Sequence, residues 1–337
     1  MQTSNNLPVV LLFLTFIPAF FIAKRYGGNL GGFFAVAMLG LHPAVIGRTL
    51  WGHADTDVYN IFFPLWLTFL FLAGFHEKDM KKRLALGALT GLVMGMYAIA
   101  WGGWWYIFDF MLATFGVYAI IRAGMVLGVF THLKSLWQRM KWPVIVVAVG
   151  LFLGLWAGKF VLMGSLIILL FLLACAFRVA KGAPLSGLYH DNRMRNMVLF
   201  ALVLIVSSGI FVSLFQGRTS GFLDAPFAPL GITTLKEAAA PNLWPNVYTT
   251  VAELNAISLK DVMNQFGRLL LFISFLGVLG TVFLKDENNH REAGYAIFLV
   301  IWFFATMYAT TKGVRFVMMM VPPFSIAFGI ASGQIIR

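Results

Sequence analysis

Residues 48–57 read RTLWGHADTD, a short polar stretch that separates two long apolar runs at 31–47 and 58–75. Asp55 and Asp57 in this stretch are the only acidic residues among the first 76. Carboxylates beside an apolar membrane run are costly to hold without a partner, so they indicate a functional site by default. The apolar runs decide the fold, and the two acids indicate where chemistry is expected.

The composition is that of a membrane protein. Hydrophobic residues make up 60% of the 337 residues and charged residues only 11%, whereas soluble domains carry about 25% charged residues. Eleven apolar runs are long enough, or nearly so, to cross a bilayer as helices, which takes about 20 residues. They lie at 7–23, 31–47, 58–75, 84–101, 103–122, 143–158, 160–180, 196–215, 266–284, 293–310 and 315–333. We therefore expect an all-α polytopic membrane protein with about eleven transmembrane helices.

The basic residues predict the orientation of the chain. In alternate loops, 17 of the 25 lysines and arginines fall on one side and 8 on the other. Cytoplasmic loops are enriched in Lys and Arg, so the richer side is cytoplasmic, and residues 48–57 face the extracytoplasmic side. The net charge of +12 is spread over short loops, which indicates topology in a lipid bilayer and excludes a nucleic-acid partner.

A long polar stretch at 216–262 lies on the same side as residues 48–57. Loops of this length without clear structure are uncommon unless they are functional or disordered. Apolar residues such as Trp244 and Leu254 argue against full disorder. We interpret this stretch as a long extracytoplasmic loop with a functional role.

Several charged residues on this side have both a functional and a structural interpretation. Asp55 and Asp57 offer the oxygen ligands that Mg²⁺ and Mn²⁺ prefer, but Asp57 would also serve as a helix N-cap. Arg48 and Arg315 border apolar runs, where an arginine either extends to the membrane interface or binds phosphate through its planar guanidinium. Spacing alone favours an exposed loop carboxylate for Glu253. These alternatives stay open on the residues alone.

Two further residues leave alternatives open. Asp109 lies inside an apolar run, where an acid belongs either to an ion path or to a hydrogen bond with a neighbouring helix; the second is favoured. His53 is a possible ligand that its position alone does not support.

Taken together, these residues resemble the catalytic subunit of oligosaccharyltransferase, in its archaeal single-subunit form. Residues 48–57 resemble the family's second acidic motif. Thr250, Val251 and Glu253 match its Thr/Ser-Ile/Val-X-Glu motif near the end of the long external loop. Gly313-Val314-Arg315-Phe316 resembles the segment whose arginine contacts the lipid-linked pyrophosphate.

The resemblance implies a GT-C-type membrane domain over residues 1–337, covering the second to the twelfth of the family's thirteen helices. On this resemblance, the family's first external loop and C-terminal soluble domain are expected to lie outside residues 1–337. The resemblance therefore implies a truncated or split protein, inactive alone, whose missing segments belong to a separate chain or an incomplete gene.

The resemblance also implies an activity. The family transfers an oligosaccharide from a dolichol-linked phosphate or pyrophosphate to asparagine in Asn-X-Ser/Thr of an acceptor protein. Glu253 and Asp55 would be catalytic, Asp55 and Asp57 would hold Mn²⁺ or Mg²⁺, and Arg315 and Arg48 would bind the donor phosphate. The site would lie on the extracytoplasmic face of the cell membrane.

Other functional classes remain open. Another polyprenol-phosphate-sugar-dependent membrane glycosyltransferase would also place acids in outer loops, but it would leave the motif around Glu253 unexplained. A transporter would place its acids near the bilayer midplane, whereas these acids lie at one surface. A non-catalytic membrane scaffold is distinguished only by an activity assay.

Overall fold

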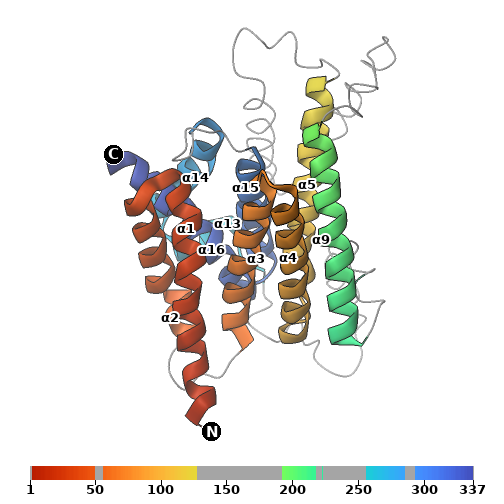
Figure 1. Ribbon diagram of the computed structural model, residues 1–337. Helices are drawn as coiled ribbons and strands as arrows, with labels where there is room; N and C mark the ends of the chain where they lie inside the picture. The colour runs from red at the N-terminus through yellow and green to blue at the C-terminus, as the bar shows by residue number, and fades with distance from the viewer. Residues whose placement is uncertain are drawn as a thin grey trace, which may run out of the picture.

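The structure is a computed structural model, and it describes residues 2–49, 56–126, 192–217, 222, 256–284 and 293–336. Every regular element in these ranges is helical, and they contain no strand. The elements in chain order are α1 (Gln2–Leu41), α2 (Pro43–Thr49), η1 (Thr56–Val58), α3 (Tyr59–His76), α4 (Met80–Ala100), α5 (Trp105–Val126), α9 (Asn192–Gln216), α13 (Leu259–Phe266), α14 (Arg268–Phe283), α15 (Ala293–Lys312), η5 (Val314–Phe316) and α16 (Val317–Ile336). The longer helices lie side by side as a bundle (Figure 1).

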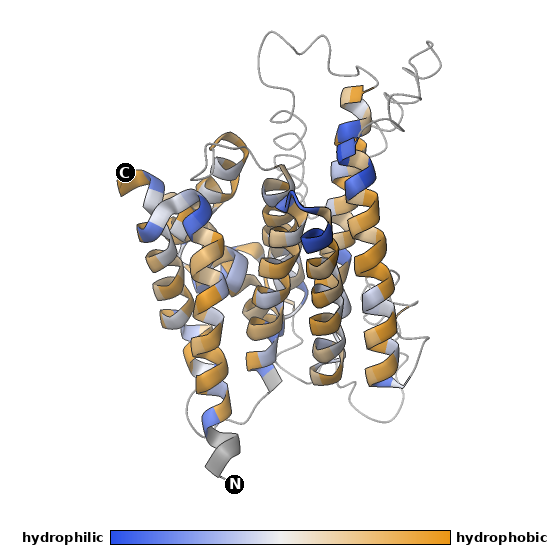
Figure 2. Cartoon of the chain, in the orientation of Figure 1, coloured by the Kyte–Doolittle hydropathy of each residue, from blue (hydrophilic) through white to orange (hydrophobic). Residues whose placement is uncertain are grey.

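The helices confirm the predicted polytopic membrane architecture. Seven described helices are long and apolar enough to cross a membrane, or as many as eight with the bent pair α13 and α14. Figure 2 shows apolar residues along the helices and polar residues at helix ends, as in the turn between α3 and α4. The predicted runs at 143–158 and 160–180 lie outside the described residues, so the total of eleven stays a prediction.

Helix α1 contains two antiparallel legs, as the separate apolar runs 7–23 and 31–47 predicted. Gly28 between them has a φ of 65°, a backbone conformation that favours glycine. A Cβ on Gly40 would lie 3.0 Å from the ring of Phe16, two positions that a straight helix would separate by about 36 Å. The chain therefore folds back at Gly28 (Figure 1).

The second leg of α1 packs against α16 through glycines. Gly27 and Gly31 face Gly329 and Gly333, and a Cβ on Gly333 would lie 2.1 Å from the carbonyl oxygen of Gly27. Small residues let two membrane helices approach until their backbones touch, and the gain is van der Waals contact. The sequence analysis did not predict this contact between the two helices.

We expect Gly333→Ala to lower the thermal unfolding midpoint of the purified chain in detergent. The added methyl group would collide with the backbone of Gly27, and overpacking of this kind costs about 1–3 kcal/mol. The matched control is Gly116→Ala, because a Cβ at Gly116 meets no atom within 4 Å. Alanine improves helix propensity by about 1 kcal/mol, so the control midpoint should stay or rise. Equal midpoints in the two variants would contradict the close packing of α1 on α16.

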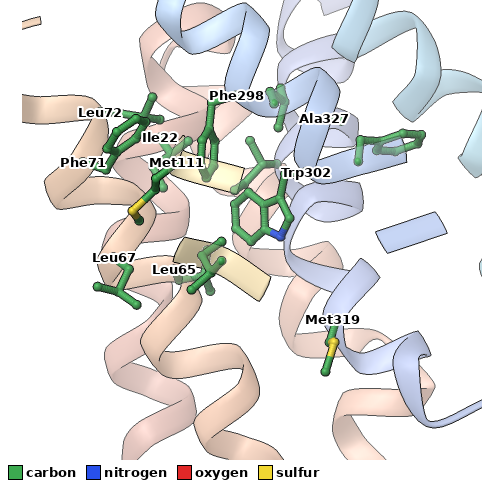
Figure 3. Close-up of a cluster of buried hydrophobic side chains, with 14 of the residues drawn as sticks. Ile22, Leu65, Leu67, Phe71, Leu72, Met111, Phe298, Trp302, Met319 and Ala327 are labelled. Carbon is green, nitrogen blue, oxygen red and sulfur yellow. The ribbon is translucent and has the colours of Figure 1, made fainter. Parts of the chain in front are cut away.

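Aromatic rings fill the core between α3, α5 and α15. Phe298 lies 5.3 Å from Phe71 and 5.6 Å from Trp302, measured between ring centroids. Figure 3 shows Trp302 beside Leu65 and Phe298, among residues of α1, α3, α5 and α16. These side chains are fully buried or nearly so. The large rings hold α15 in the middle of the bundle, and α15 leads directly to Arg315.

The end of the predicted long loop is helical, which corrects its boundary. The sequence assigned 216–262 to an irregular loop, but residues 259–266 form α13. Ser258 and Asp261 form a capping box at its start, in which each accepts a hydrogen bond from the backbone N–H of the other. Gly267, with a φ of 77°, then turns the chain by 92° into α14. Residues 218–221 and 223–255 of the predicted loop lie outside the described residues.

Candidate active site

Arg48 and Asp57 form an ion pair between two consecutive elements. Arg48 lies in the last turn of α2 and Asp57 lies in η1, directly before α3. Their Nη1 and Oδ2 atoms are 2.6 Å apart, and the side chain of Asp57 is only 6% exposed. A short charge-assisted bond of this kind is stronger than a neutral one. The N-cap position of α3 is Val58, so the interpretation of Asp57 as a helix cap is wrong.

A buried hydrogen bond fixes the start of α3, directly after the element that carries Asp57. Asn60, in the first turn of α3, accepts a hydrogen bond at 2.8 Å from the hydroxyl group of Tyr97 in α4. The Tyr97 ring stacks on Phe63 and Trp101. A satisfied polar pair in a dry core holds one arrangement, because breaking it leaves an unpaired group. Neither residue was predicted for the site; an amide inside an apolar run was the only available signal.

Arg315 lies in η5, the short connection between α15 and α16. Its side chain is half-buried, and no hydrogen bond or ion pair to it occurs within the described ranges. Thr310 donates to the carbonyl oxygen of Phe316 at 3.3 Å and fixes this connection. Nearby, the ammonium group of Lys312 lies 5.1 Å from the ring centre of Tyr308. Arg315 thus lies on a connection whose backbone is held by a hydrogen bond.

Arg315 and the Arg48–Asp57 pair lie at the same end of the bundle. Gly31 packs against Gly329, and His42 contacts Phe324, so the second leg of α1 runs antiparallel to α16. That leg ends beside α2, while α16 begins directly after η5. Helix α2 also packs against both α16 and η1. The structure brings these charged groups, far apart in sequence, to one end of the protein.

The segment that carries the predicted glutamate returns to the bundle at the same end. The N–H of Ile257 donates to the carbonyl oxygen of Thr311 at 3.2 Å. Ile257 follows Glu253 by four residues, and Thr311 precedes Arg315 by four. Glu253 itself lies outside the described residues, as do Asp55, Thr250 and Val251, so their predicted roles stay predictions.

The chemistry of the described residues fits a hard divalent cation only in part. Asp57 supplies a buried carboxylate, the type of ligand that Mg²⁺ and Mn²⁺ prefer. Within the described part of the chain, no group of three or more His, Cys, Asp or Glu residues is close enough to hold a metal ion. The second predicted ligand, Asp55, lies outside that part. Arg48, predicted to bind the donor phosphate, is instead seen to pair with Asp57.

Asp109 lies in α5, inside a candidate membrane span. Both carboxylate oxygens are buried, and neither has a hydrogen-bond partner among the residues that the structure places. The expected hydrogen bond to a neighbouring helix is therefore absent from that part of the protein.

Comparison with protein families assigns almost the whole chain to one model. Residues 6–336 match the family described as oligosaccharyl transferase STT3, N-terminal. The chain is 27% identical over 350 residues to a dolichyl-phosphooligosaccharide-protein glycotransferase of Methanococcus voltae, covering 99% of this chain and 33% of that protein. A protein of the same description from Methanocaldococcus jannaschii is 28% identical over 370 residues, covering 100% and 38%. The chain thus spans about a third of the length of the curated relatives it matches.

Solved structures show the same fold. The chain superposes with a TM-score of 0.54 and 16% identity on the archaeal oligosaccharyltransferase AglB from Archaeoglobus fulgidus, in complex with an inhibitory peptide and a dolichol-phosphate. The match covers 98% of this chain and 39% of that one. The apo form of the Archaeoglobus fulgidus enzyme gives a TM-score of 0.53 with 17% identity.

Proposed function

The chain belongs to the STT3 family of oligosaccharyl transferases, over the N-terminal part that the family model describes, and on this premise we propose that it catalyses protein N-glycosylation. In the proposed reaction an oligosaccharide moves from a dolichol-linked phosphate or pyrophosphate to asparagine of an Asn-X-Ser/Thr acceptor. The bond between the sugar C1 and the phosphate oxygen breaks. A bond between C1 and the asparagine amide nitrogen forms, the dolichyl phosphate or pyrophosphate leaves with the bonding electron pair, and one amide proton passes to solvent.

The observation that carries this proposal is the gathering of Asp57, Arg48 and Arg315 at one end of the membrane bundle. Such a site can bind a lipid-linked phosphate, because the donor's lipid extends along the membrane while its charged headgroup reaches the end of the helices. The positive-inside asymmetry of the loops supports placing this end outside the cytoplasm. A transporter would require its charged groups near the bilayer midplane.

The acceptor amide is the difficult partner, because its nitrogen lone pair is delocalised into the carbonyl group. In our proposal the carboxylate of Glu253 accepts hydrogen bonds from the amide N–H groups and so orients the nitrogen toward C1. Chain length supports this role: Glu253 precedes Ile257 by four positions, which limits the distance between their Cα atoms to about 14 Å.

The leaving phosphate is the second requirement. Asp55 and Asp57 would hold a Mn²⁺ or Mg²⁺ ion, which would act as a Lewis acid toward the phosphate oxygens. Arg315 would donate two parallel hydrogen bonds to the same phosphate. Arg48 holds the Asp57 carboxylate in place and adds positive charge to this region. Donors that are positioned before the reaction stabilise developing negative charge without rearranging.

The test is transfer by a chimera in which residues 6–336 replace the matching segment of the Methanococcus voltae relative. The chimera should glycosylate a fluorescent peptide that contains one Asn-X-Thr triplet, with dolichol-linked oligosaccharide as donor, and a Gln-X-Thr peptide should give no product. Glu253→Gln should lower the rate at least tenfold, as expected when a group that orients the reacting amide is lost. Glu77→Gln, in the turn between α3 and α4 at the other end of the bundle, is the matched control.

The outcomes separate two claims. A folded chimera that makes no glycopeptide would argue against the proposed function. A chimera whose Glu253→Gln variant transfers at the parental rate would keep the function but remove Glu253 from the site.

A further inference from the structure

His42 occupies the junction between α1 and α2 and is almost completely buried, with 5% of its surface exposed. Its Nδ1 atom accepts a hydrogen bond from the backbone N–H of Ala44 at 3.2 Å. Its carbonyl oxygen accepts from Val45 and Ile46 at 2.9 and 3.0 Å. His42 therefore caps the start of α2, the helix that ends at Arg48, because it satisfies N–H groups that have no partner inside the helix.

The His42 ring also contacts two phenylalanine rings from other helices. Its centre lies 5.0 Å from that of Phe266, the last residue of α13, and 5.9 Å from that of Phe324 in α16. Phe266 and Phe324 lie 4.9 Å apart in an edge-to-face arrangement. All three rings are buried. Ring pairs at such distances contribute about 0.5–1.5 kcal/mol beyond the burial of their area, so the three rings bind three chain segments together.

The hydrogen bonding of His42 determines its protonation. A backbone N–H only donates, so Nδ1 is the unprotonated, accepting nitrogen of a neutral imidazole, and the proton is on Nε2. Nε2 is buried and has no hydrogen-bond partner among the residues that the structure describes. A buried donor without a partner costs free energy, and the ring contacts of His42 and its cap on α2 offset this cost.

The three rings connect α2 and α13, the helices next to the two groups of candidate site residues. Helix α2 leads into Arg48 and then to Asp57. Helix α13 continues from the segment that carries Glu253. We propose that the cluster of His42, Phe266 and Phe324 holds α2 and α13 in a defined relative position, so that His42 is a positioning residue for glycan transfer. The catalytic part of this proposal rests on the proposed function, whereas its structural part does not.

The structural part is tested on the chain itself, by the distance between spin labels on α2 and α13. Gly47→Cys and Gln265→Cys provide the two labels, since Gly47 has no atom within 4 Å of an added Cβ and Gln265 is exposed. The single native cysteine is removed by Cys175→Ala. Pulsed electron spin resonance in lipid nanodiscs should give one narrow distance distribution.

Two substitutions of His42 distinguish the contribution of its ring from that of its cap on α2. His42→Phe keeps a ring and loses the accepting nitrogen, whereas His42→Asn keeps an accepting oxygen and loses the ring. The distribution of the distance between the two labels should stay narrow with His42→Phe. It should become broad with His42→Asn and with Phe266→Leu. Leu269→Ala, at a position that is 70% exposed on the neighbouring α14, is the control and should leave it narrow. A narrow distribution in both His42→Asn and Phe266→Leu would overturn the proposal, as would equal broadening in His42→Phe and His42→Asn.

The catalytic part is tested in the chimera. His42→Asn should lower kcat about tenfold or more, because a displacement of about 1 Å between reacting groups has effects of this size. Binding of dolichyl phosphate should stay unchanged, and His42→Phe should restore most of kcat. A merely structural role would lower kcat, donor binding and the unfolding midpoint together. If the labels behave as expected but the parent chimera makes no glycopeptide, the positioning of α2 and α13 stands and the proposed function fails.

Discussion

Asp57→Asn is expected to lower kcat/KM for glycan transfer by about 1,000-fold, which corresponds to about 4 kcal/mol of transition-state stabilisation. Asparagine has nearly the same shape as aspartate but carries no charge. It would lose both the short contact with Arg48 and the proposed bond to the divalent cation. The activity assay is peptide glycosylation by the chimera at several Mn²⁺ concentrations. If Asp57 is a cation ligand, the Mn²⁺ concentration that gives half-maximal rate should also rise.

A second variant separates the loss of the cation from the loss of the ion pair. Asp57→Asn leaves the charge of Arg48 without its partner, and removal of one member of a buried pair is strongly destabilising. Because Arg48 is 35% exposed, solvent reduces this cost. The double variant Arg48→Gln, Asp57→Asn removes the unpaired charge, so the unfolding midpoint should recover while transfer stays low. Recovery of transfer in the double variant would show that Asp57 acts only by pairing with Arg48.

The matched control is Asp79→Asn. Asp79 caps α4, in the turn between α3 and α4 that lies at the other end of the bundle. Aspartate and asparagine are about equally good helix caps, so both midpoint and transfer should stay at parental values.

Arg315→Gln is expected to weaken binding of dolichyl phosphate by at least tenfold and to lower transfer by about 100-fold. A preformed hydrogen-bond donor to developing negative charge is worth about 100- to 1,000-fold in kcat. Arg315→Lys keeps the charge but loses the planar pair of donors, so its effects should be intermediate. Binding is measured on the 337-residue chain in nanodiscs, and transfer is measured in the chimera.

Arg268→Gln is the control for Arg315→Gln. Arg268 opens α14, is exposed, and donates from Nε to Asn264 at 3.2 Å. Its removal changes the net charge equally but at a place outside the proposed site. If both variants weaken donor binding to the same extent, Arg315 acts through the general field of the protein and not through a contact with the phosphate.

Much of the fold could be predicted from the sequence, because helices in lipid are determined locally. Each run of apolar residues must satisfy its backbone hydrogen bonds within itself, so run length alone predicts a spanning helix. The runs 58–75 and 196–215 correspond closely to α3 and α9 for this reason. Helix α13 was missed because it has only eight residues and its sequence, LKDVMNQF, mixes polar and apolar residues.

The candidate site was predictable in its residue types but not in its contacts. Asp57 and Arg315 stood out because charged groups at membrane boundaries are few. The pairing of Asp57 with Arg48 was not visible, because a spacing of nine residues does not determine a distance when the chain turns between two helices. Asn60 and Tyr97 were not visible for the same reason, since 37 residues separate them.

The sequence by itself determined that this protein is a polytopic membrane protein and which charged groups stand at the boundary of its apolar runs. These properties follow from the cost of placing polar atoms in lipid. For each segment this cost depends on its own residues and not on its neighbours. Only the tertiary structure decided that α1 packs on α16 through glycines. It alone placed Arg48 against Asp57 and His42 against Phe266 and Phe324. Such contacts depend on shape complementarity between helices that are distant in the chain, and residue spacing does not encode it.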